Sequence, residues 1–296
     1  MSNLFEGVFT ALITPFKNNQ IDGEALRNLI EYQITNGVHG IVPCGTTGES
    51  ATLSHEEHRE VIRLAILAAA GRVKVIAGAG SNSTSESIEL ARYAQQAGAD
   101  GALLITPYYN KPGQEGLYQH YRAIAESVQI PLVLYNVPGR TGVDLLPSTV
   151  ARLANLGSIV GLKEATAGME RASTIRRMCG NAITLFSGDD ATFLPFLSIG
   201  GKGVISVTSN VAPAQMVAIW NAWQAGDAAM ALDAHEFLLD LNQKLFCETN
   251  PIPVKAAAAM LGLCEPEIRL PLTWLAENNQ AIVRATLVKM GLLAAA

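Results

Sequence analysis

The 296-residue sequence contains few cysteines and few charged residues, and both shortages limit what the protein can be. Its four cysteines are Cys44, Cys179, Cys247 and Cys264. They lie far apart and form no C-x-x-C pair, so a zinc ribbon, a redox pair and a disulfide framework are disfavoured, and we expect reduced thiols in a cytoplasmic protein. Charged residues make up only 16% of the chain and the net charge is −5. No basic run is present that could hold nucleic acid or a membrane surface.

Long apolar runs and nucleotide-binding motifs are missing as well. No stretch approaches the roughly 18 consecutive apolar residues of a transmembrane helix. The first residues, MSNLFEGVFTALITPF, lack the basic start and the long apolar centre of a secretory signal, so we expect no such leader. No G-x-G-x-x-G follows the first apolar run, and no G-K-[ST] ending marks a phosphate-binding loop.

What the sequence does contain is a regular alternation of short apolar runs and longer segments with helical periodicity. The runs span residues 8–13, 40–44, 73–77, 102–106, 132–135, 159–162, 183–186 and 204–207. Asp22, and Ser54 together with Glu57, are suited to cap two of the intervening helices. Eight near-continuous apolar strands, each followed by a helix, predict an α/β fold in which parallel strands close into a (β/α)8 TIM barrel.

The strand-like runs stop after about residue 225. Three helical segments follow, at residues 227–246, 251–262 and 271–291. The sequence therefore predicts a barrel domain over residues 1–224, which carries the functional site, and a small all-helical C-terminal domain over residues 225–296.

Lys163 follows the apolar run at residues 159–162 directly, where a long ammonium side chain is costly to bury. The C-terminal ends of barrel strands converge on one site, and an apolar site depresses the pKa of an ammonium group until it can attack a carbonyl. The pattern leaves a second interpretation open, a buried ion pair with Glu164 or Asp189. Against part of it, Glu164 should point to the opposite face of the strand from Lys163.

Other strand ends carry polar groups that fit this chemistry without proving it. The segment GTTG at residues 45–48 is either a tight turn or a cradle of N–H and hydroxyl groups for a carboxylate. Tyr108, Tyr109 and Tyr135 either pack against neighbours or, beside a lysine, exchange protons with a Schiff base. His55 and His58 form an H-x-x-H pair without an acidic partner at ligand spacing, so we expect no zinc. Together these features are typical of class I aldolase chemistry.

Six segments of the sequence resemble the dihydrodipicolinate synthase family of pyruvate-dependent aldolases. They are GTTGESATL, TPYYNKPGQEGLYQHY, LYNVPGRTG, GLKEATAG, SGDDATFLPFLSIGGKGVISVTSNV and NPIPVKAAAAMLG. The resemblance runs nearly from end to end. One departure is Gly139, where relatives often carry serine, but it leaves Arg140 in register. The resemblance implies a lyase of the diaminopimelate route to L-lysine. Such an enzyme condenses pyruvate with L-aspartate 4-semialdehyde to 4-hydroxy-tetrahydrodipicolinate through a Schiff base, without a metal or organic cofactor.

The resemblance also implies catalytic roles for four residues. Lys163 matches the lysine that attacks the ketone of pyruvate. Tyr135, Thr46 and Tyr109 match a proton relay in which Tyr135 is the main acid–base group. Tyr109 is expected to reach into the site of a neighbouring subunit, which implies a homo-oligomer, a tetramer built as a dimer of dimers.

Four further residues match substrate-binding positions of the family. Thr47, together with Thr46, is expected to hold the carboxylate of pyruvate. Arg140 is expected to hold the carboxylate of the semialdehyde, a task suited to its planar, two-pronged guanidinium group. Gly188 and Ile205 match positions that line the pocket.

Some members of the family are inhibited by L-lysine in a cleft between two subunits. The residues that match the lysine-sensitive pattern are Ser50, Ala51, His55, His58, Asn82, Glu86 and Tyr108. His55 and His58 share one helix face, and Glu86 can pair with the ammonium group of the effector. Tyr108 is adjacent to Tyr109 and so connects the cleft to the relay.

Two alternatives remain at this point. The first is another enzyme of the same superfamily, an N-acetylneuraminate lyase or a keto-deoxy sugar-acid aldolase, which would share Lys163 and Tyr135. Arg140 discriminates against it, because sugar-acid aldolases need hydroxyl-binding groups at that position. The second is a non-catalytic barrel that binds pyruvate or lysine as a sensor, and the intact set of Lys163, Tyr135, Thr46 and Arg140 disfavours it.

Overall fold

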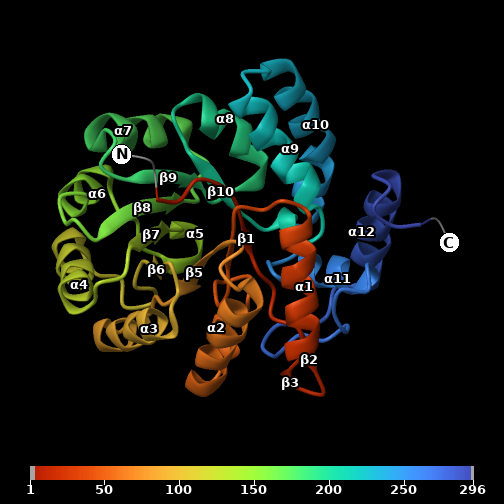
Figure 1. The fold of residues 1–296 in the computed structure, drawn as a ribbon, viewed down its shortest axis with the longest axis horizontal. Helices are drawn as coiled ribbons and strands as arrows, with labels where there is room; N and C mark the ends of the chain where they lie inside the picture. The colour runs from red at the N-terminus through yellow and green to blue at the C-terminus, as the bar shows by residue number, and fades with distance from the viewer. Residues whose placement is uncertain (1–3, 295–296) are drawn as a thin grey trace.

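A closed barrel of parallel strands forms the centre of the molecule in the computed structural model, which describes residues 4–294 (Figure 1). Within these residues, eight strands follow one another around the barrel in the order β1-β10-β9-β8-β7-β6-β5-β4. They are β1 (Gly7–Ala11), β4 (Gly40–Val42), β5 (Lys74–Gly78), β6 (Gly101–Ile105), β7 (Leu132–Asn136), β8 (Ile159–Glu164), β9 (Thr184–Ser187) and β10 (Gly203–Ser206). A separate antiparallel hairpin joins β2 (Phe16–Lys17) to β3 (Gln20–Ile21). The predicted (β/α)8 barrel is confirmed.

Helices surround the strands (Figure 1). Those of the barrel are α1 (Gly23–Thr35), α2 (His55–Ala69), α3 (Thr84–Ala97), α4 (Gln114–Ser127), α5 (Pro138–Thr141), α6 (Pro147–Leu153), α7 (Met169–Cys179), α8 (Phe193–Ser198) and α9 (Pro213–Gln224). Three short 3-10 turns, η1 (Ser50–Thr52), η2 (Asp190–Thr192) and η3 (Thr208–Asn210), follow β4, β9 and β10 within the described chain. The C-terminal part contributes α10 (Ala228–Lys244), α11 (Ile252–Met260) and α12 (Glu277–Lys289).

Two predicted helix caps are present. The side chain of Asp22 accepts a hydrogen bond from the N–H of Ala25 at 2.9 Å, at the start of α1. Ser54 and Glu57 exchange side-chain and backbone hydrogen bonds at the start of α2, which is a complete capping box. The third C-terminal helix begins at Glu277 and not at residue 271, so that part of the prediction was wrong.

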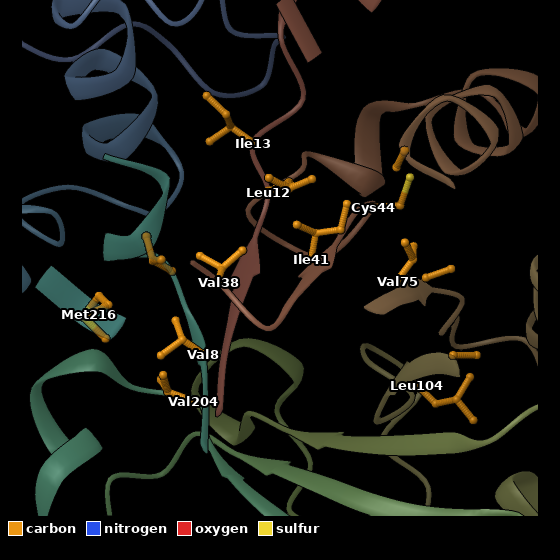
Figure 2. Close-up of a cluster of buried hydrophobic side chains, with 14 of the residues drawn as sticks. Val8, Leu12, Ile13, Val38, Ile41, Cys44, Val75, Leu104, Val204 and Met216 are labelled. Atoms are coloured by element: carbon orange, nitrogen blue, oxygen red, sulfur yellow. The ribbon is translucent and has the colours of Figure 1, made fainter. Parts of the chain in front are cut away.

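Two hydrophobic clusters lie on opposite faces of the barrel strands. The inner cluster consists of Phe5, Phe9, Ala11, Val42, Ile76, Leu103, Val133, Tyr135, Val137, Phe186 and Ile205. The outer one packs the strands against the helices, and Figure 2 shows part of it, including Val8 and Val204. Consecutive residues such as Val8 and Phe9 belong to different clusters, because side chains alternate along a strand. Burial of both faces explains why the strands read as continuous apolar runs.

A buried ion pair connects the C-terminal helices to the barrel. Lys255 of α11 pairs with Glu49 in the loop after β4, and the two side chains are 0% and 1% exposed. The second carboxylate oxygen of Glu49 accepts the backbone N–H of Arg269 at 3.1 Å. The Lys255 ammonium group lies 4.1 Å from the centre of the Phe16 ring. Burial lowers the pKa of Lys255, an effect that the Glu49 carboxylate partly opposes.

The division of the chain into two domains at residue 225 stays a prediction.

No helix within residues 4–294 combines the length and the apolar character that crossing a membrane requires.

The Lys255–Glu49 pair leads to a stability prediction. Replacing Lys255 by Met should lower the free energy of unfolding by about 3–5 kcal/mol, because the Glu49 carboxylate then stays buried without a counter-charge. Lys289→Met is the matched control. Its ion pair with Asp240 is 3.3 Å long, and the Lys289 side chain is 74% exposed, so its loss should cost at most about 1 kcal/mol. Urea-induced unfolding measures both; equal effects would contradict the importance of the buried pair.

Candidate active site

Lys163 and Tyr135 lie side by side at the carboxyl-terminal end of the barrel. The pairing of β7 with β8 places Tyr135 directly opposite Lys163. The Lys163 ammonium nitrogen is 4.3 Å from the centre of the Tyr135 ring. Lys163 is 5% and Tyr135 7% exposed, and the tyrosine belongs to the inner cluster. The structure therefore brings together the predicted nucleophile and the predicted main acid–base group.

Neither of the ion pairs considered for Lys163 is present. Among residues 4–294, no carboxylate lies within ion-pair distance of its ammonium group. Glu164 instead pairs with the guanidinium group of Arg171 at 3.0 Å. Glu164 faces away from Lys163, as expected for consecutive residues of a strand.

The outer faces of β7 and β8 are joined by a polar network that sequence reasoning missed. The Nδ2 of Asn136 donates to both carboxylate oxygens of Glu164, at 3.3 and 3.2 Å, and to Asp144 at 2.9 Å. Arg171 pairs with both Glu164 and Asp144. Asn136 directly follows Tyr135, and Glu164 directly follows Lys163. The network thus holds the two strands together behind the Tyr135–Lys163 pair. Polar residues following two candidate catalytic residues were the signal that could have found it.

The segment at residues 45–48 is a tight turn with two unused donors. The N–H groups of Gly48 and Glu49 bond to the carbonyls of Gly45 and Thr46, both at 3.1 Å. The N–H groups of Thr46 and Thr47 make no hydrogen bond to any group among residues 4–294. The two interpretations of this segment are therefore compatible, since the turn leaves adjacent donors that suit a carboxylate.

Thr46 lies at the meeting point of two hollows. A small one of about 30 Å³ is lined by Thr46, Tyr135 and Cys44, among others. Burial raises the pKa of the Cys44 thiol well above its usual range, in line with a packing role for this cysteine. A larger hollow of about 380 Å³, which we call the rim cavity, is also lined by Thr46. Thr46 thus lines both the small hollow beside Tyr135 and the rim cavity.

The rim cavity combines residues of the two predicted sites. From the active-site group it is lined by Thr46 and Arg140, and from the lysine-binding group by Ser50, Ala51, His58, Glu86 and Tyr108. His55 lies beside it, with Nε2 3.7 Å from the Glu86 carboxylate. Asn82 does not line it; its carbonyl accepts a hydrogen bond from Asn110 at 2.9 Å.

His58 and Glu86 are two of the titratable side chains that line the rim cavity, together with Arg140 and Glu49. His58 is buried, with Nε2 2.7 Å from the carbonyl oxygen of Gly78. Burial lowers the pKa of His58 below its usual value, so the ring is neutral at physiological pH. Glu86 accepts a hydrogen bond from the Ser81 hydroxyl. The Glu86 carboxylate is therefore fixed in place and available to a cation in the cavity.

Tyr109 is the one predicted catalytic residue that stands apart within the described chain. Its side chain is 88% exposed, and its backbone has a positive φ of 70°. Within a single chain, the relay of Thr46, Tyr135 and Tyr109 is therefore not assembled.

The remaining predicted residues occupy distinct places. Ile205 is buried in the inner cluster. Gly188 follows β9, and its N–H donates to the Glu164 carbonyl at 2.8 Å. A Cβ at Gly188 would lie 2.6 Å from the Cβ of Ala165, so the close approach of these segments requires glycine.

Arg140 and Thr47 are joined by a residue that the sequence patterns did not single out. Arg140 donates through Nη2 to the backbone carbonyl of Asn250 at 3.1 Å. The side-chain Nδ2 of Asn250 donates to Thr47 Oγ1 at 3.0 Å. Asn250 also lines the rim cavity, together with Thr249. The segment NPIPVKAAAAMLG, which begins with Asn250, was the available signal.

No cluster of three or more His, Cys, Asp or Glu side chains suited to a metal ion occurs between residues 4 and 294.

Comparison with known proteins gives consistent matches over nearly the whole chain. A model of the dihydrodipicolinate synthetase family matches residues 4–290. A 4-hydroxy-tetrahydrodipicolinate synthase of Magnetococcus marinus is 60% identical over 98% of this chain and 99% of its own length. The dihydrodipicolinate synthase of Acinetobacter baumannii, solved in complex with pyruvate, superimposes with a TM-score of 0.96 at 47% identity, over 97% of this chain and 99% of that one. The enzyme of Cyanidioschyzon merolae, solved with lysine bound, superimposes with a TM-score of 0.96 at 41% identity, over 99% of this chain and 100% of that one.

Proposed function

Because this chain belongs to the dihydrodipicolinate synthetase family, we propose that it acts as a 4-hydroxy-tetrahydrodipicolinate synthase with Lys163 as its nucleophile. It condenses pyruvate with L-aspartate 4-semialdehyde, a lyase reaction of the diaminopimelate route to L-lysine. The observation that carries the role of Lys163 is its position, buried at the barrel end against the Tyr135 ring and without a counter-ion in the described chain. With no carboxylate bound to it, the Lys163 nitrogen is available to a substrate carbonyl at the barrel end.

The reaction begins with attack of the Lys163 amine on the keto carbon of pyruvate. The resulting carbinolamine loses its hydroxyl group as water, with a proton supplied by Tyr135, and becomes a Schiff base. Loss of a methyl proton converts the Schiff base to an enamine. The enamine carbon attacks the aldehyde carbon of the second substrate, whose oxygen takes up a proton. The amino group of the adduct then attacks the imine carbon and displaces Lys163, which closes the ring and restores the enzyme. No metal or organic cofactor takes part in these steps.

Thr46 and Thr47 hold the carboxylate of pyruvate. Their two backbone N–H groups are adjacent and bond to no other group in the described chain, which supports this role. Anchoring the carboxylate fixes the keto carbon relative to Lys163 and so lowers the entropic cost of the attack. The Acinetobacter baumannii relative, which was solved with pyruvate, supports pyruvate as the first substrate.

Arg140 holds the carboxylate of L-aspartate 4-semialdehyde. Its position on the lining of the rim cavity supports this role, since Thr46 lines the same cavity. A guanidinium group there favours a carboxylate-bearing aldehyde over a neutral polyol chain, which disfavours a sugar-acid aldolase. Gly188 and Ile205 complete the pocket walls.

Tyr109 completes the proton relay in a second copy of the chain. Its exposed side chain cannot serve the site of its own chain but is available to a neighbour. We propose a homotetramer, arranged as a dimer of dimers, in the cytoplasm.

L-lysine inhibits the enzyme from the rim cavity. The fixed Glu86 carboxylate suits its ammonium group, and Ser50, Ala51, His58 and Tyr108 line the same cavity. His55 lies beside the cavity, and Asn82 is the member of the proposed set that does not line it. The Cyanidioschyzon merolae relative was solved with lysine bound, which supports this proposal. Ser50 lies two residues after Gly48, the last residue of the turn proposed to hold pyruvate, so an effector there adjoins the catalytic loop.

Borohydride reduction in the presence of pyruvate tests the nucleophile. Reduction of the Schiff base should leave a stable adduct on Lys163 alone, because among the lysines of the described chain it is Lys163 whose ammonium group lies over the Tyr135 ring. Peptide mass mapping of every lysine locates the adduct. Lys163→Met should abolish it, whereas Lys202→Met should not, since Lys202 precedes β10 at the opposite end of the barrel. An adduct on any other lysine, or none, would rule out the mechanism.

Replacing Arg140 by Ala separates the two substrates. The value of kcat/KM for the semialdehyde should fall by about 10- to 100-fold, because a charge-assisted hydrogen bond is lost. Adduct formation with pyruvate alone should change little. Arg152→Ala is the control, because Arg152 pairs with Glu115 on the surface at 2.9 Å. Equal loss of both half-reactions in Arg140→Ala would mean that this arginine has only a structural role.

Removing the charge of Glu86 tests the effector site. Glu86→Gln should raise the L-lysine concentration needed for half-inhibition by at least about tenfold, because a charged hydrogen-bond partner of the ammonium group is lost. Glu89→Gln, an exposed change on the same helix, is the control and should leave inhibition unchanged. Initial rates at millimolar-range L-lysine give the answer; an uninhibited wild-type enzyme would refute the regulatory proposal.

A further inference from the structure

Asn250 bonds to both of the groups proposed to hold substrate carboxylates. It is buried between α10 and α11, and it is far from Thr47 and Arg140 in the sequence. Its backbone carbonyl accepts from Arg140 Nη2 at 3.1 Å, and its side-chain Nδ2 donates to Thr47 Oγ1 at 3.0 Å. A single residue of the C-terminal part thus connects the pyruvate side of the site to the semialdehyde side.

The direction of the Asn250–Thr47 hydrogen bond decides what the Thr47 hydroxyl can do. A hydroxyl has one O–H donor and two acceptor lone pairs, whereas an amide nitrogen only donates. Asn250 therefore occupies a lone pair of Thr47 Oγ1 and leaves the Thr47 proton unused. The hydroxyl donates to no group among residues 4–294. Its proton is available to a carboxylate held by the neighbouring N–H groups.

The other half of the Asn250 amide indicates that this orientation has a cost. The Oδ1 atom is buried and accepts no hydrogen bond within the described chain. Rotating the amide would place Oδ1 against Thr47 and let it accept the hydroxyl proton. Nδ2 would then take the place where Oδ1 now has no partner, so either orientation leaves one amide atom unsatisfied in the described chain, and the observed orientation gives Thr47 a donor.

The surrounding chain fixes Asn250 against the turn. Lys255, five residues further on, forms the buried ion pair with Glu49, which is two residues after Thr47. The backbone N–H of Arg269 bonds to the same carboxylate. Two segments that are bonded at both places have little freedom to separate.

We propose that Asn250 is a positioning residue that turns the Thr47 hydroxyl proton toward the carboxylate of pyruvate and holds Arg140 through its carbonyl. It acts through Thr47 and Arg140 and does not itself touch the reacting atoms. This inference rests on the function proposed above. Because any side chain keeps the backbone carbonyl, substitutions of Asn250 test the Thr47 contact alone.

Two substitutions of Asn250 make different changes to Thr47. Asn250→Ala removes the donor, and the pyruvate concentration for half-maximal adduct formation should rise about five- to tenfold. Asn250→Asp keeps the shape but supplies an acceptor that takes the Thr47 proton, so its effect should be at least several times larger than that of Asn250→Ala. The dependence of borohydride trapping at Lys163 on pyruvate concentration measures both without the second substrate.

The Asn250 substitutions are repeated in a Thr47→Val variant, since valine has no hydroxyl group that Asn250 could orient. In this background Asn250→Ala should change the pyruvate dependence by less than about twofold, because residues that act through one contact are not additive. Asn250→Asp compared with Asn250→Ala in the same background isolates the effect of the added charge. A difference between them as large as in the wild-type background would show that charge, and not proton direction, is responsible, and would overturn the proposal.

Asn242→Ala is the matched structural control. Asn242 is also buried on a C-terminal element, bonds to a threonine (Thr208 Oγ1, 2.7 Å), and has an unsatisfied amide atom. Its loss should lower the thermal midpoint without changing the pyruvate dependence. If Asn250→Ala does not fold, the isosteric Asn250→Asp, measured with and without Thr47→Val, still decides. Absence of a wild-type adduct would refute the proposed function; a normal wild-type adduct with an unchanged pyruvate dependence in the Asn250 variants would refute only the positioning role.

Discussion

The parallel pairing of β7 with β8 is the constraint on which the site depends. One register places Tyr135 opposite Lys163 on the inner face and Asn136 opposite Glu164 on the outer face. A shift by one residue would exchange the faces and bury the wrong pair. The outer pair is hydrogen-bonded and tied to Arg171, so it stabilises the register that the inner pair needs. The inner pair can therefore remain without a counter-ion, since its position is fixed from behind.

The strands were predictable because burial on both faces makes each one a compact apolar run, and all eight lie within two residues of their predicted bounds. The positions of Lys163 and Tyr135 at strand ends followed from the same logic, whereas their proposed roles came from the family resemblance. Asn250 did not, because its contact with Thr47 joins positions 203 residues apart and has no local pattern. The alternative ion pair for Lys163 failed for a similar reason, because Arg171 of the next helix takes Glu164. α12 begins after Ala276, which makes no side-chain capping hydrogen bond, so no capping signal in the sequence marked its start.

The residues proposed to bind the substrates and those proposed to bind L-lysine meet in one hollow, and one loop contributes to both groups. This loop connects β4 to η1. Thr46 lies within the loop and Ser50 and Ala51 begin η1, and all three residues line the rim cavity. The loop is short and internally hydrogen-bonded, and the N–H of Ser50 donates to the carbonyl of Gly45 at 3.4 Å. Regulation by a ligand in this cavity needs no long pathway through the core, because the two sites are neighbours along the chain.

The Glu49–Lys255 pair limits which segments of related chains can be exchanged, in evolution or by protein engineering. Neither partner is tolerable alone in a dry interior, so a barrel loop and a C-terminal helix must change together or not at all. Chimaeras that join the barrel of one relative to the helices of another will succeed only at junctions that keep both charges. The C-terminal helices are thus coupled to the loop after β4, and an exchange that keeps the pair intact has to carry both Glu49 and Lys255.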